Sequence, residues 1–184
     1  AFQNCFSLKT VVFAESSSMQ SIGKGAFAFC TSLESIVNLP GNASYGTYMF
    51  QYCTSLTQIS IPAGVTALPN YMFRYCTSLA QIALPESVTS IGQYAFQNCT
   101  SLAEIDISNV TSIGNFAFNF SGLTKITIPE AIKTLGNQIF NGCSKLKTVT
   151  LHDNITSFGT SLFTDCTSLE SITLPSGLKT FGTS

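Results

Sequence analysis

The sequence has few charged residues and no long apolar run. Lys, Arg, Asp and Glu make up 9% of its 184 residues, whereas an ordinary soluble domain has about 25%. Eight basic residues stand against nine acidic ones, which gives a formal net charge of −1. Nucleic acids and anionic membranes both bind basic stripes, so we expect no nucleic-acid partner and no membrane binding through a charged face. No apolar stretch approaches the ~20 residues of a spanning helix, so we expect no direct membrane insertion.

Sequence motifs of catalysis and metal binding are also missing. There is no phosphate-binding loop, paired-carboxylate motif or metal-ligand motif. The single histidine, His152, precedes Asp153. Such a pair could orient a base, but a triad also needs an activated nucleophile and an oxyanion hole, and Ser and Thr are too common here to single one out. We therefore interpret His152 as a solvated turn residue and expect no catalytic residue, no cofactor, no metal site and no enzymatic activity.

What the chain has instead is a phenylalanine that recurs at intervals of 22 to 25 residues. The column consists of Phe2, Phe27, Phe50, Phe73, Phe96, Phe118, Phe140 and Phe163. A recurrence of this regularity over a whole chain predicts a solenoid, in which each unit contacts only its neighbours.

Three further columns follow each phenylalanine at fixed distances. A cysteine comes three residues later in seven units, a leucine comes three residues after that position, and a β-branched residue lies three further on. The columns are Cys5, Cys30, Cys53, Cys76, Cys99, Cys143 and Cys166; Leu8, Leu33, Leu56, Leu79, Leu102, Leu123, Leu146 and Leu169; and Val11, Ile36, Ile59, Ile82, Ile105, Ile126, Val149 and Ile172. Residues 57–61 and 124–128 alternate polar and apolar side chains, which predicts a half-buried strand around the last column.

Proline and glycine indicate where each predicted strand ends. Five units carry a proline directly after the strand, where its missing N–H and fixed φ are tolerated. These prolines are Pro40, Pro62, Pro85, Pro129 and Pro175. A second short apolar segment follows, as in residues 88–92, and in seven units a glycine comes directly after its last apolar residue. We interpret this glycine as a corner that needs either a positive φ or a close approach of backbone.

Together the columns predict a β-rich solenoid with parallel strands and about eight repeats of 21–25 residues. Residues 1–184 would form one domain. Equivalent side chains from successive units would stack on one another, and the phenylalanine column, beside the cysteine column, would be buried core. A single unit has no core of its own, so burial would come only from stacking.

The repeat resembles the BspA-type leucine-rich repeat. The resemblance rests on residues 91–102, which read Ile-Gly-Gln-Tyr-Ala-Phe-Gln-Asn-Cys-Thr-Ser-Leu, and on residues 126–129, which read Ile-Thr-Ile-Pro. It covers essentially the whole chain and implies a leucine-rich-repeat solenoid. Proteins of that family are typically long surface or secreted proteins of host-associated bacteria and some protists. The resemblance therefore implies a cell-surface or secreted location and a role in adhesion or host-protein binding.

The chain begins and ends within a unit, and some units depart from the pattern. We expect it to be part of a longer protein, because no polar cap covers either terminal repeat, and we expect the exposed end repeats to associate end to end. The unit that contains Phe118 is one residue short and lacks the cysteine. The unit that contains Leu33 has an extra residue in its strand, at residues 36–40.

The cysteines lie at least 23 residues apart, which excludes the close pairs typical of zinc sites. Stacked units could bring neighbouring cysteine Cα atoms to roughly 5 Å, a distance that a disulfide can span. However, side chains in a parallel ladder point the same way, and seven is an odd number. We favour a column of buried free thiols that pack as small apolar groups over a set of disulfides.

The outward-facing positions of the predicted main strands form a candidate binding face. They present small and polar side chains with one cluster of charges, at Glu104, Asp106 and Lys125. The candidate residues are Gln58, Ser60, Gln81, Glu104, Asp106, Lys125, Thr127, Thr150 and Thr173. One interpretation is a solubilising face with cross-strand Thr packing; the other is a shallow face that binds a protein or a glycan.

The leading functional hypothesis is a non-enzymatic binding or adhesion array for a protein or glycan ligand. Many weak contacts along such a face would gain strength from multivalency. Two alternatives remain: a structural spacer that holds another domain away from the cell, and an accessory repeat region of a longer enzyme.

Overall fold

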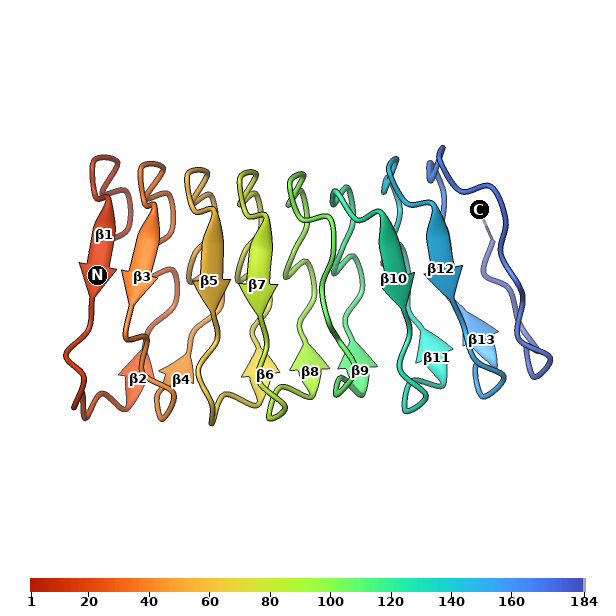
Figure 1. The fold of residues 1–184 in the computed structure, drawn as a ribbon, viewed down its shortest axis with the longest axis horizontal. Coiled ribbons are helices and arrows are strands. Elements are labelled where there is room, and N and C mark those ends of the chain that lie inside the picture. The colour runs from red at the N-terminus through yellow and green to blue at the C-terminus, as the bar shows by residue number, and fades with distance from the viewer. Residues whose placement is uncertain (184) are drawn as a thin grey trace.

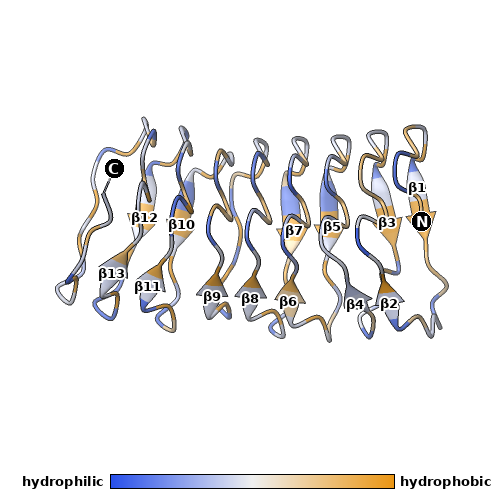
Figure 2. Ribbon diagram, turned by 180° about the vertical axis from the view of Figure 1, so that it is seen from behind, coloured by the Kyte–Doolittle hydropathy of each residue, from blue (hydrophilic) through white to orange (hydrophobic). Residues whose placement is uncertain are grey.

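The computed structural model describes residues 1–183, so the last residue of the predicted domain 1–184 lies outside the described residues. Within this range every regular element is a β-strand, and the strands form a parallel β-solenoid, as predicted. The turns lie side by side along one axis, with the two chain ends at opposite ends of the stack (Figure 1). Apolar residues recur at corresponding positions in neighbouring turns (Figure 2).

Each turn contributes up to two strands, which form two separate rows (Figure 1). The longer strands have three residues each and correspond to the predicted main strand. They are β1 (Thr10–Val12), β3 (Ser35–Val37), β5 (Gln58–Ser60), β7 (Gln81–Ala83), β10 (Lys125–Thr127) and β12 (Thr148–Thr150). The shorter strands have two residues each and correspond to the second apolar segment. They are β2 (Ser21–Ile22), β4 (Ser44–Tyr45), β6 (Ala67–Leu68), β8 (Ser90–Ile91), β9 (Ser112–Ile113), β11 (Thr134–Leu135) and β13 (Ser157–Phe158).

Strand pairing is parallel and in the register that the columns predict. In the main row β1 pairs with β3, β5 with β7, and β10 with β12, so that Ile59 lies opposite Ile82 and Ile126 opposite Val149. The main row is therefore a series of strand pairs and not one continuous sheet. Between β3 and β5 the interruption follows the extra residue of that unit, since Asn38 adopts a φ of 56° and bends the chain.

The sequence predicted about eight repeats, each with a main strand, but only six of these main strands form in the described residues. Residues 103–107 form no strand. There Asp106 accepts a hydrogen bond from the Ser108 N–H through its own side chain, at 2.9 Å, and this local turn replaces strand geometry. Residues 171–174 also form no strand, and they lie in the last turn, with a neighbouring turn on one side only.

The core is a continuous stack of phenylalanine rings. Neighbouring rings of the column lie 5.3 to 5.8 Å apart, centroid to centroid, and are nearly parallel. The six inner members, from Phe27 to Phe140, are buried, whereas Phe2 in the first turn is 50% exposed. The prediction that this column is core is confirmed, and Phe2 is exposed because the described residues place a turn against only one side of its ring.

The bend around each phenylalanine is held by backbone hydrogen bonds to the next turn. The N–H of Phe73 donates to the carbonyl of Ala95 at 2.8 Å, and the same bond recurs from turn to turn. Two positions of the bend, two residues before and two residues after the phenylalanine, adopt positive φ in nearly every turn. The predicted corner glycines do not adopt positive φ, as Gly114 shows. A Cβ at Gly114 would, however, lie 2.5 Å from the backbone N of Gln93. Close approach is therefore what this corner requires.

Candidate binding surface

The nine predicted residues all lie exposed along the main row of strands, which we call the strand face. Six of them belong to β5, β7, β10 and β12. Glu104 and Asp106 lie in the irregular segment between β7 and β10, and Thr173 lies in the irregular last turn. Side chains alternate along each strand, so the polar members point outward while the isoleucines between them point inward.

The structure gathers five of the nine residues at one shallow concavity of about 760 Å³, where the sheet is interrupted. These are Gln81, Glu104, Asp106, Lys125 and Thr127. A second concavity of about 740 Å³, over β3, β5 and β7, includes Gln58, Ser60 and Gln81. Thr150 and Thr173 line neither of these two hollows. Both hollows are open to solvent along one side, an arrangement that suits an extended or flat ligand better than a small one that needs to be enclosed.

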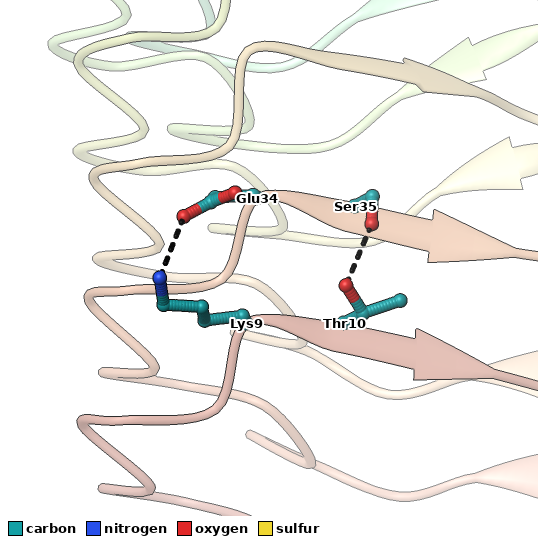
Figure 3. Close-up of polar contacts among 4 residues, drawn as sticks. All are labelled: Lys9, Thr10, Glu34 and Ser35. Carbon is teal, nitrogen blue, oxygen red and sulfur yellow. Dashed lines mark hydrogen bonds and ion pairs between the residues drawn. The ribbon is translucent and has the colours of Figure 1, made fainter.

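One ion pair lies at the larger concavity, which is also lined by the carboxylates of Asp106 and Glu130, neither of them ion-paired within the described residues. Lys125 Nζ lies 3.0 Å from Glu104 Oε1, and both side chains are about 60% exposed. A second pair, between Lys9 and Glu34, lies at 3.8 Å at the start of the same face, beside the Thr10–Ser35 hydroxyl contact of 3.1 Å (Figure 3). Exposed pairs of this kind contribute about 0–1 kcal/mol to stability. Their charges therefore remain available to a ligand.

The seven cysteines are free thiols and form the predicted column. From the second turn on, each thiol donates a hydrogen bond to the carbonyl of the phenylalanine one turn earlier, as Cys76 does to Phe50 at 3.1 Å. Burial raises the pKa of Cys53, Cys76 and Cys99. These thiols stay protonated and are poor nucleophiles at neutral pH. In the short unit, Ser121 takes the place of the cysteine and contacts the Cys143 sulfur at 3.3 Å.

His152 is held by backbone groups and does not form a His-Asp pair. Its Nε2 lies 2.8 Å from the carbonyl oxygen of Pro129, and its Nδ1 accepts from the Asn154 N–H at 3.2 Å. Asp153 instead accepts from the N–H and hydroxyl of Ser176, which lowers the pKa of its carboxyl group. The sequence predicted a solvated turn residue, but the histidine is half-buried. It occupies a strand-end position where other units have proline.

A ladder of side-chain hydrogen bonds along the bend, which we call the amide ladder, was not predicted from the sequence. It runs through the positions directly after Phe73, Phe96, Phe118 and Phe140. Arg74 Nε donates to Gln97 at 2.6 Å, Gln97 donates to Asn119 at 2.8 Å, and Asn119 donates to Asn141 at 2.8 Å. Asn119 and Asn141 are buried. The signal was that Gln or Asn occupies this position in five of the eight units, but the hydrogen bonding depends on rotamers that spacing does not specify.

Two stacks of aromatic rings on the surface of the bend were not predicted either. One stack consists of Tyr48, Tyr71, Tyr94 and Phe116, two residues before the core phenylalanines; the other consists of Phe29, Tyr52 and Tyr75, two residues after them. Ring centroids within each stack lie 4.4 to 4.8 Å apart. All seven residues are half-buried and have positive φ. We call these seven rings the aromatic strip.

Two further properties of the described residues bear on function. Within residues 1–183, no three His, Cys, Asp or Glu side chains lie close enough to hold a metal ion. The same residues include no apolar helix long enough to cross a bilayer.

Comparison with known proteins identifies the repeat type. A family model described as BspA type Leucine rich repeat region matches residues 1–118 and 94–184, with six copies. The count of six is lower than the predicted eight, and the predicted resemblance is confirmed. No curated protein sequence matches the chain.

Several solved structures share the fold. A leucine-rich repeat protein of T. pallidum is 30% identical, with a TM-score of 0.79 over 87% of this chain and 77% of its own. A leucine rich cell surface protein of Faecalibacterium prausnitzii is 28% identical, with a TM-score of 0.63 over 98% of this chain and 64% of its own. A leucine-rich repeat protein of Bacteroides ovatus, 22% identical with a TM-score of 0.53 over 98% of this chain and 70% of its own, supports the fold alone.

Proposed function

Because the chain belongs to the BspA-type leucine-rich repeat family, we propose that it is a non-enzymatic binding array that acts on a cell surface or after secretion. Its ligand is a protein or a glycan. A surface location is supported by the likeness to the F. prausnitzii cell surface protein. The proposal assigns binding to the strand face.

The concavity between β7 and β10 is the observation that carries this proposal. Five exposed polar or charged residues of the strand face surround half-buried or buried isoleucines there, such as Ile82 and Ile126. A polar rim around a less polar floor is typical of protein interaction surfaces. The absence of a strand at residues 103–107 also leaves backbone groups at this place outside the sheet ladder, and these groups can bind a ligand's own polar groups.

Such an open face gives weak individual contacts. A ligand that touches several turns at once would bind more tightly than any single contact allows, because each further contact becomes intramolecular. The parallel register places equivalent side chains of successive turns in line. A repetitive ligand, such as a matrix protein or a polysaccharide, fits this arrangement.

The test is a binding screen of the immobilised protein against extracellular matrix proteins and purified glycans. The informative variant is Lys125→Glu, which removes the ion pair with Glu104 and reverses one charge at the concavity. Lys133→Glu is the matched control, because Lys133 is exposed but does not line the concavity. We expect a ligand whose affinity falls at least fivefold in Lys125→Glu and is unchanged in Lys133→Glu.

Binding that is equal in the two variants would contradict the assignment to the strand face. No binding above background for the wild type would overturn the proposal and favour the alternatives, a structural spacer or an accessory repeat region.

A further inference from the structure

The aromatic strip and the strand face lie on different segments of each turn, so the strip is a second exposed surface that the proposed function does not use. Its two stacks are adjacent, because the Arg74 guanidinium carbon lies 5.7 Å from the Tyr71 ring centroid and 5.0 Å from the Tyr75 centroid. Arg74 therefore lies between the stacks. At one end of the longer stack, Lys24 Nζ lies 5.2 Å from the Tyr48 centroid.

The stacking decides which part of each ring a ligand can reach. Rings within a stack lie within 7 to 9° of parallel at centroid distances under 5 Å, so each inner ring covers the faces of its neighbours. What remains exposed is the ring edges and the tyrosine hydroxyls. An aromatic edge carries the positive part of the ring quadrupole. The pKa of Tyr71 is raised, first by burial and then by Tyr48 and Tyr94, so its hydroxyl remains a neutral donor.

The fixed charges around the strip have one sign. The bend segments that carry it are residues 23–33, 46–56, 69–79, 92–102 and 114–123. They contain Lys24 and Arg74 and no Asp or Glu, although the chain has nine acidic residues in all. Arg74 uses its Nε in the bond to Gln97. The guanidinium has five N–H donors, so its terminal nitrogens can still donate to a carboxylate.

The backbone conformation argues that these rings are more than packing. Positive φ strains a side chain with a Cβ, and glycine or asparagine is the usual choice there. Other turns have those residues in the same columns, at Gly25, Asn98 and Gly142, or smaller or more flexible polar residues, at Gln138, Ser161 and Asp165. The strip residues keep bulky rings at this strained conformation, and the rings end half exposed on the surface. Tyrosine and arginine are the residues enriched at binding hot spots.

We propose that the aromatic strip binds an extended acidic peptide segment of a partner protein. Carboxylates of the peptide would pair with Arg74 and Lys24 and lie against ring edges and tyrosine hydroxyls. The longer stack runs about 14 Å from Tyr48 to Phe116, which matches about four residues of extended peptide at ~3.3 Å each. A sugar ring would instead need an exposed aromatic face, which only the end members of a stack could offer.

The test uses a fluorescent peptide of alternating Glu and Gly, eight residues long, and the same peptide with Gln in place of Glu. We expect the Glu peptide to bind at low salt, and to bind at least tenfold more weakly at 0.5 M NaCl because exposed charges are screened there. The Gln peptide should bind at least tenfold more weakly than the Glu peptide at low salt. Arg74→Gln should lower the affinity for the Glu peptide at least fivefold.

Matched variants separate the strip from general charge and from loss of folding. Lys133→Gln removes an exposed cation elsewhere and should leave binding unchanged. Tyr71→Ala should weaken binding, whereas Gln138→Ala, in the same column with φ of 53° but beyond the strip, should not. If Tyr71→Ala fails to fold, Tyr71→Phe keeps the ring and tests the hydroxyl alone, with an expected loss of twofold or more.

Three outcomes would overturn the proposal. The first is that the Glu and Gln peptides bind with equal affinity. The second is that Arg74→Gln and Lys133→Gln change the affinity for the Glu peptide by the same factor. The third is that a saturating amount of unlabelled Glu peptide fails to displace the fluorescent Glu peptide. Tighter binding of a sulfated glycan, with loss in Arg74→Gln, would reassign the strip to anionic glycans. Lys125→Glu changes the strand face and leaves the aromatic strip intact. The test of ligand binding at the strand face is therefore independent of the test of peptide binding at the strip.

Discussion

The Cys99 thiol donates a hydrogen bond to the carbonyl oxygen of Phe73, one turn earlier, over 3.1 Å. The same carbonyl also accepts the N–H of Cys76 at 3.0 Å. One carbonyl oxygen thus accepts both a buried thiol and a backbone N–H of the bend, and the arrangement recurs along the stack. Because only the protonated thiol can donate this hydrogen bond, the folded structure favours the protonated form.

We expect the protein to lose stability above about pH 9. Burial raises the pKa of Cys99 above its ordinary 9.0, and raises that of Cys166 to about 12. The unfolded chain then releases protons that the folded chain retains, so the free energy of unfolding falls as pH rises from about 9 toward and beyond 12. The slope is at most about 1.4 kcal/mol per pH unit for a fully buried thiol such as Cys99, and solvent screening makes it smaller for the partly exposed Cys166.

Urea unfolding at pH 7.5, 9, 10 and 11 measures this slope. Cys99→Ala should be less stable at neutral pH but should show a shallower alkaline decline than the wild type. A free energy of unfolding that stays constant from pH 9 to 11 would contradict the assignment.

We expect Phe96→Ala to destabilise the protein by about 3–5 kcal/mol, because it opens a cavity in a buried stack. Phe96 is fully buried between Phe73 and Phe118, at 5.5 and 5.3 Å. Phe2→Ala is the matched control, since Phe2 belongs to the same column but is 50% exposed, and its cost should stay under about 1 kcal/mol. Chemical denaturation measures both, and similar costs would argue against a common buried stack.

We expect Gly114→Ala to cost about 1–3 kcal/mol through overpacking. A Cβ at Gly114 would lie 2.5 Å from the Gln93 N and 2.8 Å from the Gly92 carbonyl carbon, and backbone cannot move aside as a side chain can. Gly23 occupies the same column, yet its Cβ would meet nothing within 4 Å. Gly23→Ala should therefore be neutral or slightly stabilising. Thermal melting of the two variants checks this, and equal shifts would refute it.

We expect Asn119→Ala to cost about 1–3 kcal/mol, since it leaves buried amide groups without partners. Asn119 accepts from Gln97 and donates to both the carbonyl and the side chain of Asn141. Gln93→Ala is the control, because Gln93 is exposed and only its backbone N–H is bonded to a neighbouring side chain. If Asn119→Ala unfolds at the same urea concentration as Gln93→Ala, the amide ladder does not contribute to stability.

The sequence predicted the core because the same types of apolar residue recur there from turn to turn. The phenylalanine column has no substitution, and burial follows from a column that stays apolar. The glycine at the Gly114 corner was predicted to serve either a positive φ or a close approach of backbone. The sequence could not decide between the two, since it does not show how close the previous turn lies. The interruption near Asp106 was not predicted, although the shortened unit that follows it was noticed. A one-residue deletion does not reveal which hydrogen bonds are lost.

The aromatic strip escaped prediction for a different reason. Its two columns change from aromatic residues to glycine, asparagine, glutamine, serine or aspartate along the chain, so neither has a constant chemical type. Backbone rules also reserve positive φ for glycine and asparagine, and nothing local marks Tyr71 as an exception. Only stacking between turns explains how these rings are held. The strand face was predicted in position, because alternation in a strand decides which side chains point outward.

The placement of the two chain ends at opposite ends of the stack has a mechanical consequence (Figure 1). A pull between them acts along the axis, and each turn is joined to the next by its own set of contacts. Load is therefore expected to peel turns from one extremity in succession, each releasing 22 to 25 residues of slack. An array built this way would lengthen stepwise under tension and absorb a shock before any attachment at its ends gave way.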